Sequence, residues 1–380
     1  MKEKVEEIDN QINNLKKKNN IKNIIIIVLS IILVIGAILN IPKVRKSINN
    51  YSKQQKLEST YNSKYKLNLE SVYGDTEAYH PKILSFDNQW NGYYYWMSYT
   101  PYPDSDEQKE NPHIVASNDL VNWVTPDGLE NPLDDIEGND SRKYNSDSHL
   151  TMNTDLNRLE CYWRMVDDEI NRVTIYRRYT TDGVNWSDKE AITISNDRHK
   201  KDYISPAIIY EDGIYKIWYV DHDYTVRYAE AKDNEQWKDI KELNLYYPRK
   251  LQSWHLDVVK TDKGYEMLIM AFKNWDKRGV ASLYHTESKD NKKWSKCTEI
   301  IKPTSKTKNW DNRGMYRSSM IKKDGIYYVF YSASDKENIK GIGIMYGKDI
   351  NKLHKVNIDY KNDVDAAKKF EKLIKKEKNR

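Results

Sequence analysis

The segment Thr180-Thr181-Asp182-Gly183-Val184-Asn185-Trp186 contains an Asp-x3-Trp pattern that recurs along the chain and predicts its architecture. The equivalent segments are Ser117-Asn118-Asp119 before Trp123, Ala231-Lys232-Asp233 before Trp237, Ser288-Lys289-Asp290 before Trp294, and Gly347-Lys348-Asp349 before Leu353. Neighbouring segments are 51 to 63 residues apart, about the length of a four-stranded sheet with its turns. The sequence therefore predicts five units of one β architecture.

Hairpin signals accompany each of these units. Asp212-Gly213 and Asp324-Gly325 lie between alternating apolar runs, as do Asn91-Gly92, Lys263-Gly264 and the variant Asn157-Arg158. Such dipeptides favour tight turns because their backbone matches the twist of the flanking strands. Closing five sheets around an axis protects their edge strands, so we expect an all-β, five-bladed β-propeller over residues 71–357. In each turn the Asp should bind backbone amides and the Trp should pack between sheets, which are structural tasks.

The N-terminal region has a different character. Residues 1–22 are rich in Lys and carry apolar residues at heptad spacing, so they predict a cytoplasmic amphipathic segment capable of weak self-association. Residues 23–42 contain no charge, and Ile24 to Ile41 would reach roughly 27 Å as a helix. A cleaved signal peptide is the competing interpretation, but no small-x-small cleavage site follows the apolar run. We therefore expect a transmembrane helix, followed by a linker over residues 43–70.

Other features bound the cellular context. We expect a single-pass protein of the cell membrane with its propeller on the extracytoplasmic side. Residues 358–380 are basic, with apolar residues at helical spacing, and predict a short C-terminal helix or tail. Cys161 and Cys297 are too few for a disulfide framework and are expected to be buried thiols. The net charge of +5 over 380 residues gives no argument for nucleic acid.

Polar residues recur where the first strand of each unit begins. In a propeller these strands line the axis, and alternate residues of a strand share one face. Ionisable groups should therefore converge in a single funnel. A purely structural channel could have been lined with apolar residues at a lower desolvation cost, so the polar lining indicates a site. The convergent residues are His80, Lys82, Asp147, His149, His255, Asp257 and Arg317.

A long loop in the first unit adds to this funnel. Residues 99–112 separate the second and third strands, so Glu110 is expected at the funnel mouth. Arg164, on the second strand of the second unit, should end at the same mouth and hold a carboxylate or a sugar hydroxyl. Tyr102 and Trp254 are candidates for stacking on sugar rings.

Over residues 71–357 the sequence resembles the five-bladed propeller glycosidases, the group of arabinanases, xylosidases, levansucrases and invertases. The resemblance rests on the number of units, the short motifs of the first strands and the Ser-x-Asp-x3-Trp turns. In that group the first blade opens with Asp-Pro, whose Asp is base or nucleophile, a second-blade Asp tunes the site and a third-blade Glu is the acid. This chain has His80-Pro81 and Ser205-Pro206 at the first and third positions, whereas Asp147 matches the group.

The resemblance implies a glycosidase acting on a polysaccharide, and its carboxyl groups must then come from other positions, since glycoside hydrolysis ordinarily needs two. We expect Asp147 as base or nucleophile, Glu110 as acid and Asp257 as a third carboxyl group. The expected substrate-binding residues are His80, His149, Arg164, His255, Arg317, Tyr102 and Trp254.

No cofactor is expected for this reaction. The alternative is a divalent metal ion at the axis, because His80, His149, His255, Asp147 and Asp257 are suitable ligand types, although no close-spaced motif supports it. Two other functions stay open. The propeller could be a carbohydrate-binding module without catalysis, or a scaffold for surface-polysaccharide assembly.

Overall fold

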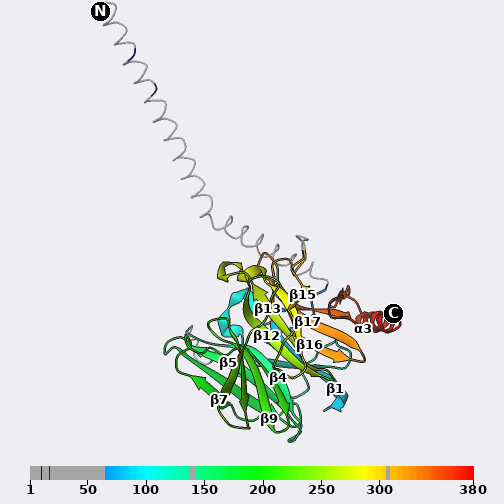
Figure 1. Cartoon of the computed structure of the whole chain (residues 1–380). Coiled ribbons are helices and arrows are strands. Elements are labelled where there is room, and N and C mark those ends of the chain that lie inside the picture. Colours follow the sequence, from blue (N-terminus) through cyan, green and yellow to red (C-terminus); the bar gives the residue numbers. More distant parts are fainter. Residues whose placement is uncertain (1–9, 11–16, 18–64, 137–141, 305–308) are drawn as a thin grey trace, which may run out of the picture. The chain divides into compact units, whose positions relative to one another are not determined.

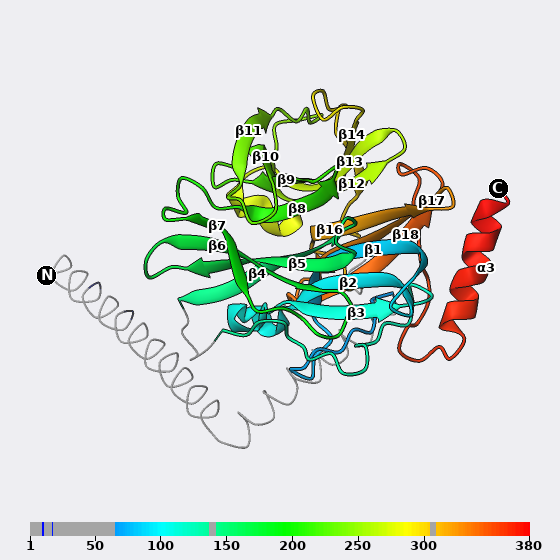
Figure 2. The ribbon, with the colours of Figure 1, turned by 90° about the horizontal axis from the view of Figure 1, so that it is seen from below.

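The computed structural model describes residues 10, 17, 65–136, 142–304 and 309–380. Five antiparallel sheets stand around one axis as the blades of a β-propeller (Figures 1 and 2), which confirms the predicted fold. The predicted segments 1–22 and 23–42, and most of the linker, lie outside the described residues apart from Asn10 and Lys17. Within the described ranges, no helix has both the length and the apolar character needed to cross a bilayer.

Each blade is a meander that starts at the axis and ends at the rim. Blade 1 contains β1 (Ala78–Trp90), β2 (Tyr93–Pro101) and β3 (His113–Ser117). Blade 2 contains β4 (Lys143–Asn153), β5 (Arg158–Asp167), β6 (Arg172–Thr180) and β7 (Glu190–Ser195). Blade 3 contains β8 (Ile204–Glu211), β9 (Ile214–Val220), β10 (Val226–Ala231) and β11 (Lys238–Leu243). Blade 4 contains β12 (Gln252–Thr261), β13 (Gly264–Phe272), β14 (Ser282–Ser288) and β15 (Thr298–Ile301). Blade 5 contains β16 (Gly314–Lys323), β17 (Ile326–Ser334), β18 (Lys340–Gly347) and β19 (His354–Lys355).

Three short 3-10 helices and one α-helix complete the described elements. They are η1 (Pro103–Ser105) and η2 (Glu107–Lys109) in the loop between β2 and β3, η4 (Trp275–Val280) between β13 and β14, and α3 (Ala366–Lys378). Helix α3 lies beside β17 and β18 (Figure 2) and packs Phe370 against Tyr328 and Tyr346 of those strands. This helix confirms the predicted C-terminal element.

The Asp-x3-Trp segments perform the structural tasks predicted for them. Asp182 accepts hydrogen bonds from the backbone N–H groups of Val184 (2.9 Å) and Asn185 (2.8 Å). Trp123 packs edge-on against Phe330 of β17 and so joins blade 1 to blade 5. Asp233 is different, because its carboxylate accepts hydrogen bonds from arginines of blade 2. The repeat therefore fixes turns and packs blades together.

Both ends of the propeller contribute to the outer edge of blade 5. On β18, Met345 and Tyr346 pair with β19, whereas Gly343 pairs with Lys66, far upstream in the sequence. The N–H of Leu67 also donates to the carbonyl of Ile342 at 2.7 Å. The ring is thus closed by strand pairing between the beginning and the end of the domain. The thiols of Cys161 and Cys297 are free and buried, as expected.

Candidate active site

Every innermost strand is irregular close to its first residues. The pairing register shifts between Tyr79 and Lys82 in β1, between Ser146 and His149 in β4, between Ile204 and Ala207 in β8, between Ser253 and His255 in β12, and between Met315 and Ser318 in β16. Such bulges redirect side chains, and they recur here at one end of the axis. Three residues in these bulges have a positive φ although none of them is a glycine: His80 (50°), Asp147 (54°) and Ser205 (53°). Strained backbone of this kind clusters at functional sites.

The bulges bring His80, Asp147 and His255 together. One nitrogen or oxygen atom from each lies within 4.8 Å of the others, and all three residues are buried. Asp147 Oδ1 is 3.2 Å from His255 Nδ1 and 3.9 Å from His80 Nε2. The guanidinium of Arg317 is 3.8 Å from the same oxygen. Blades 1, 2, 4 and 5 thus each contribute one group to a buried polar cluster.

Charge separates the protonation states within this cluster. Burial opposes the ionisation of Asp147, but His255, His80 and Arg317 together hold the pKa of its carboxyl well below the usual range. Burial lowers the pKa of His80 well below its ordinary value and also lowers the pKa of His255. Burial favours the neutral form of both imidazoles, and Arg317 is then the positive group that stabilises the Asp147 carboxylate. Each neutral imidazole has a nitrogen lone pair available as a ligand.

Glu110 lies on the other side of the His80 ring. It follows η2 in the predicted loop, and its Oε1 is 3.5 Å from His80 Nδ1. That nitrogen is hydrogen-bonded to Thr100 Oγ1 at 2.7 Å. Burial and the nearby charge of Asp147 raise the pKa of Glu110 well above its usual range. A proton-holding carboxyl group and an ionised one therefore flank the same imidazole.

Three other predicted residues do not contact His80, Asp147 or His255 directly. Asp257 accepts hydrogen bonds from Lys82 Nζ and Ser319 Oγ, both at 2.7 Å, farther along the axis. His149 is hydrogen-bonded through Nε2 to the backbone of Ile208, and its Nδ1 is 3.2 Å from Arg317 Nη2, through which it contacts the cluster. Arg164 forms an ion pair with Asp202. Their polar groups are engaged with the protein itself.

Aromatic rings form one wall of the site. The ring of Tyr316 lies 4.2 Å from that of His255 and 5.2 Å from that of His80, measured between centroids. Tyr79 stacks on Tyr316 at 4.7 Å, and Tyr102 lies 6.2 Å from Tyr79. Trp254 contacts His255 edge-on at 5.9 Å. Tyr79 and Thr100 were missed in the sequence, because strict alternation along β1 places Tyr79 on the opposite face from His80.

The donor set of the cluster fits a divalent metal ion. Asp147 Oδ1 and both ring nitrogens of His255 are buried and make no hydrogen bond. His80 uses Nδ1 for Thr100, which leaves Nε2 facing Asp147. Two neutral imidazoles and one carboxylate are a common ligand set for transition metals in hydrolases. The residues present can therefore hold such an ion.

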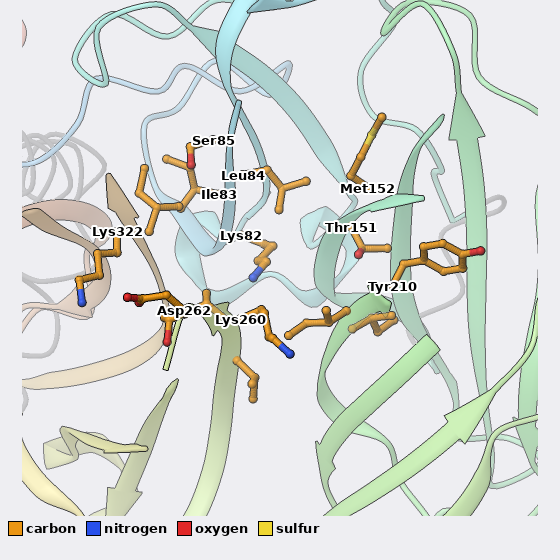
Figure 3. Close-up of a pocket in the computed structure, with 16 residues that line it drawn as sticks. Lys82, Ile83, Leu84, Ser85, Thr151, Met152, Tyr210, Lys260, Asp262 and Lys322 are labelled. Carbon is orange, nitrogen blue, oxygen red and sulfur yellow. The ribbon is translucent and has the colours of Figure 1, made fainter. Parts of the chain in front are cut away.

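A cavity opens at the opposite end of the axis, where the same five strands end. It has a volume of about 470 Å³, and Lys82, Lys260 and Lys322 all contribute to its lining (Figure 3). Lys82 is paired with Asp257, Lys260 with Glu211, and Lys322 donates to a tyrosine hydroxyl. The histidine cluster is absent from this mouth, and we place the candidate site at the other one.

Comparisons with known proteins agree with the five-bladed propeller fold. No family model matches the chain. The "A type blood N-acetyl-alpha-D-galactosamine deacetylase" of Flavonifractor plautii is 28% identical over 322 residues, which covers 70% of this chain. The chain spans 41% of the length of that relative.

Solved structures give the same architecture. The crystal structure of an N-acetylgalactosamine deacetylase from F. plautii, in complex with blood group B trisaccharide, superposes with a TM-score of 0.65 at 22% identity, covering 74% of this chain and 93% of that one. An exo-1,5-alpha-L-arabinanase from a bovine ruminal metagenomic library gives a TM-score of 0.51 at 13% identity, covering 71% and 93%. The chain thus has the five-bladed fold of carbohydrate-active enzymes that include glycoside hydrolases and a sugar deacetylase.

Proposed function

We propose that this propeller is a hydrolase that removes the acetyl group from an N-acetylated sugar of a glycan. The observation that carries the proposal is the cluster of His80, Asp147 and His255 with the proton-holding Glu110 beside it. The deacetylase activity for which the F. plautii relative is named supports it. Histidine replaces the expected carboxylate in blade 1, and Ser205 of blade 3 is hydrogen-bonded to the backbone of Leu256.

The proposed reaction consumes one water molecule. Its oxygen adds to the acetamide carbonyl, the C–N bond breaks, and the products are acetate and the amino sugar. Glu110 holds a proton that it can deliver to the departing nitrogen, because its carboxyl group is kept neutral by burial and by Asp147. When bound, a divalent ion held by His80, Asp147 and His255 would polarise the carbonyl and lower the pKa of water.

Other residues of the chain position these groups. Arg317 donates to the carbonyl of Pro206 at 3.0 Å, which fixes its guanidinium next to Asp147. Thr100 orients the ring of His80 through Nδ1. The stacked rings of Tyr79 and Tyr316 form an apolar wall against which a sugar can pack.

Acetate release from glycans that contain N-acetylhexosamine tests the proposal. Asp147→Asn and Glu110→Gln should each lower turnover about 100-fold or more, because each removes a group of the reacting site. Asp262→Asn, at the opposite mouth, is the matched control and should retain turnover. Release of free sugar without acetate would contradict deacetylation.

That contrary outcome corresponds to a second candidate function. An ionised Asp147 and a proton-holding Glu110 are also the pair that glycoside hydrolysis uses, which favours the predicted glycosidase. Reducing-end formation on the same glycans distinguishes the two reactions. Glycan binding with neither product would instead identify a carbohydrate-binding module.

We further propose that residues 23–42 anchor the protein in the cell membrane with the propeller outside, where it meets surface glycans. The uncharged apolar run supports this placement. The full chain should partition with membranes, whereas a chain beginning at residue 43 should not. Equal partitioning of the two chains would contradict the anchor, and unchanged assembly without residues 1–22 would contradict self-association there.

A further inference from the structure

A basic cavity adjoins the reacting site, and its cationic side chains have no role in the proposed hydrolysis. Its volume is about 300 Å³, and it lies where blade 5 meets blade 1 and η4. The lining side chains that bear on its chemistry are Tyr79, Tyr102, Tyr316, Arg278, Arg313 and Lys340.

Positive charge dominates this cavity. Arg278, Arg313 and Lys340 line it, and no Asp or Glu is found among its lining residues in the described part of the chain. Arg313 Nη1 donates to the side-chain oxygen of Asn338 at 2.8 Å, a neutral partner. Lys340 is buried, and its Nζ donates to Ser105 Oγ at 2.8 Å. The same ammonium forms an ion pair with Glu77, whose Oε2 is 3.9 Å from Nζ.

The cavity and the reacting site share a wall. Tyr79 and Tyr316 line the cavity, and the ring of Tyr316 also contacts His80 and His255. Arg278 stacks over the indole of Trp254, with its guanidinium carbon 5.4 Å from the ring centre. A glycan that places its acetamide at the cluster can therefore extend its next sugar over these rings towards the arginines.

The contrast with the opposite mouth is informative. There, Lys82 forms an ion pair with Asp257, and Lys260 forms one with Glu211. Beside the reacting site, the guanidinium of Arg313 is held by an amide instead. Arginine forks match the planar geometry of carboxylates and phosphates and can bind them through two parallel hydrogen bonds.

We propose that this cavity binds the acidic group, carboxylate or phosphate, of the sugar next to the one that reacts, so that the substrate is an anionic N-acetylated glycan. This inference rests on the proposed function for the position of the reacting sugar. The aromatic rings would pack against one face of the pyranose ring, and the arginines would bind the negatively charged group of the sugar.

Calorimetric titration of the full chain tests this without requiring turnover. The probe is a tetrasaccharide of alternating glucuronic acid and N-acetylglucosamine, compared with its carboxyl-reduced, neutral form. We expect the acidic form to bind about 10-fold more tightly, as for a charge-assisted hydrogen bond that is partly exposed. Raising the salt concentration should reduce the difference.

Arg313→Gln and Arg278→Gln, made separately, should each reduce the preference for the acidic form by at least about threefold. Lys263→Gln removes one exposed charge in the turn between β12 and β13 and serves as the matched control, with the preference retained. Melting temperatures of the variants show whether each is folded. Lys340 is not substituted, because its ammonium holds Ser105 and the carbonyl of Asn338 in place.

A phosphate-bearing N-acetylglucosamine oligomer and its dephosphorylated form make the second arm, which separates a phosphate from a carboxylate source. Preference for the charged form in either arm, lost in the arginine variants, supports the proposal. Equal binding of charged and neutral forms in both arms overturns it, as does a preference that both arginine variants keep. Acetate release is followed in parallel: charge preference without acetate refutes only the deacetylase, and acetate release without preference refutes only the acidic substrate.

Discussion

Lys66→Met should stabilise the propeller at neutral pH, although it deletes a charge at the strand pairing that closes the ring. Lys66 is buried and its Nζ makes no hydrogen bond. Burial lowers the pKa of this ammonium from 10.5 to about 8, against the attraction of Glu77, Asp75 and Asp335. At 1.36 kcal/mol per pH unit, holding the charged form costs about 3 kcal/mol of folding free energy.

Methionine preserves the packing that the lysine stem provides. A Cβ on Gly341 would lie 2.4 Å from Lys66 Cδ, so the stem occupies the space that this glycine leaves. Methionine has a similar unbranched shape and no ammonium to desolvate. We therefore expect Lys66→Met to raise the free energy of unfolding at pH 7 by about 2 to 3 kcal/mol.

The pH dependence provides the sharper test. Below pH 8 the folded and unfolded chains both hold the proton, and the full penalty is present. Between pH 8 and 10.5 the unfolded chain binds more protons than the folded one, so the wild-type protein gains stability as pH rises. The advantage of Lys66→Met should shrink across this window.

Urea unfolding followed by tryptophan fluorescence, at pH 7 and at pH 10, measures that difference. Lys289→Met, at an exposed turn of blade 4, is the control and should change stability little at either pH. A Lys66→Met protein less stable than wild type at pH 7, or an advantage independent of pH, would refute the reasoning.

Three further predictions concern the turns and the site. Gly183→Ala should destabilise the fold by about 3 kcal/mol, because φ is +79° at this glycine and a Cβ there would lie 2.3 Å from the ring of Trp96. Gly213 has a similar φ of +78° but open space around it, so Gly213→Ala should cost only about 1 kcal/mol in the same urea titration. Asp147→Asn should weaken the binding of Zn²⁺ to chelator-treated protein about 100-fold or more in calorimetry, and unchanged affinity would exclude this residue as a ligand. Tyr316→Ala should raise KM for the glycan about 10-fold while Tyr316→Phe should not, since the stacking face is what the substrate uses; equal losses in both would point to the hydroxyl.

The fold could be predicted from the sequence because its signals are local. Each Asp of an Asp-x3-Trp segment is expected to act on amides two or three residues away, as Asp182 does on Val184 and Asn185. Such contacts leave a regular trace in the sequence, and the number of repeats gives the number of blades.

The site was only partly predictable, because the bulges break the alternation on which the strand argument depends. His80 and Lys82 were expected on one face, yet the positive φ at His80 turns its ring to the cluster while Lys82 pairs with Asp257 farther along the axis. Arg278 and Arg313 lie outside the strands, in segments whose sequence has no strand or helix periodicity. Only the folded structure brings them beside Tyr316.

The shared outer edge of blade 5 imposes an order on biosynthesis. Residues 66 and 67 leave the ribosome before any blade, but their pairing partners on β18 belong to the last blade made. Until then the open ring exposes unpaired strand edges, the surfaces through which β proteins aggregate. How long a nascent chain is exposed to aggregation therefore depends on how quickly blade 5 is synthesised and folds. Loss of residues 65–67 would leave all five blades in place but remove the strand pairing with β18 that closes the ring.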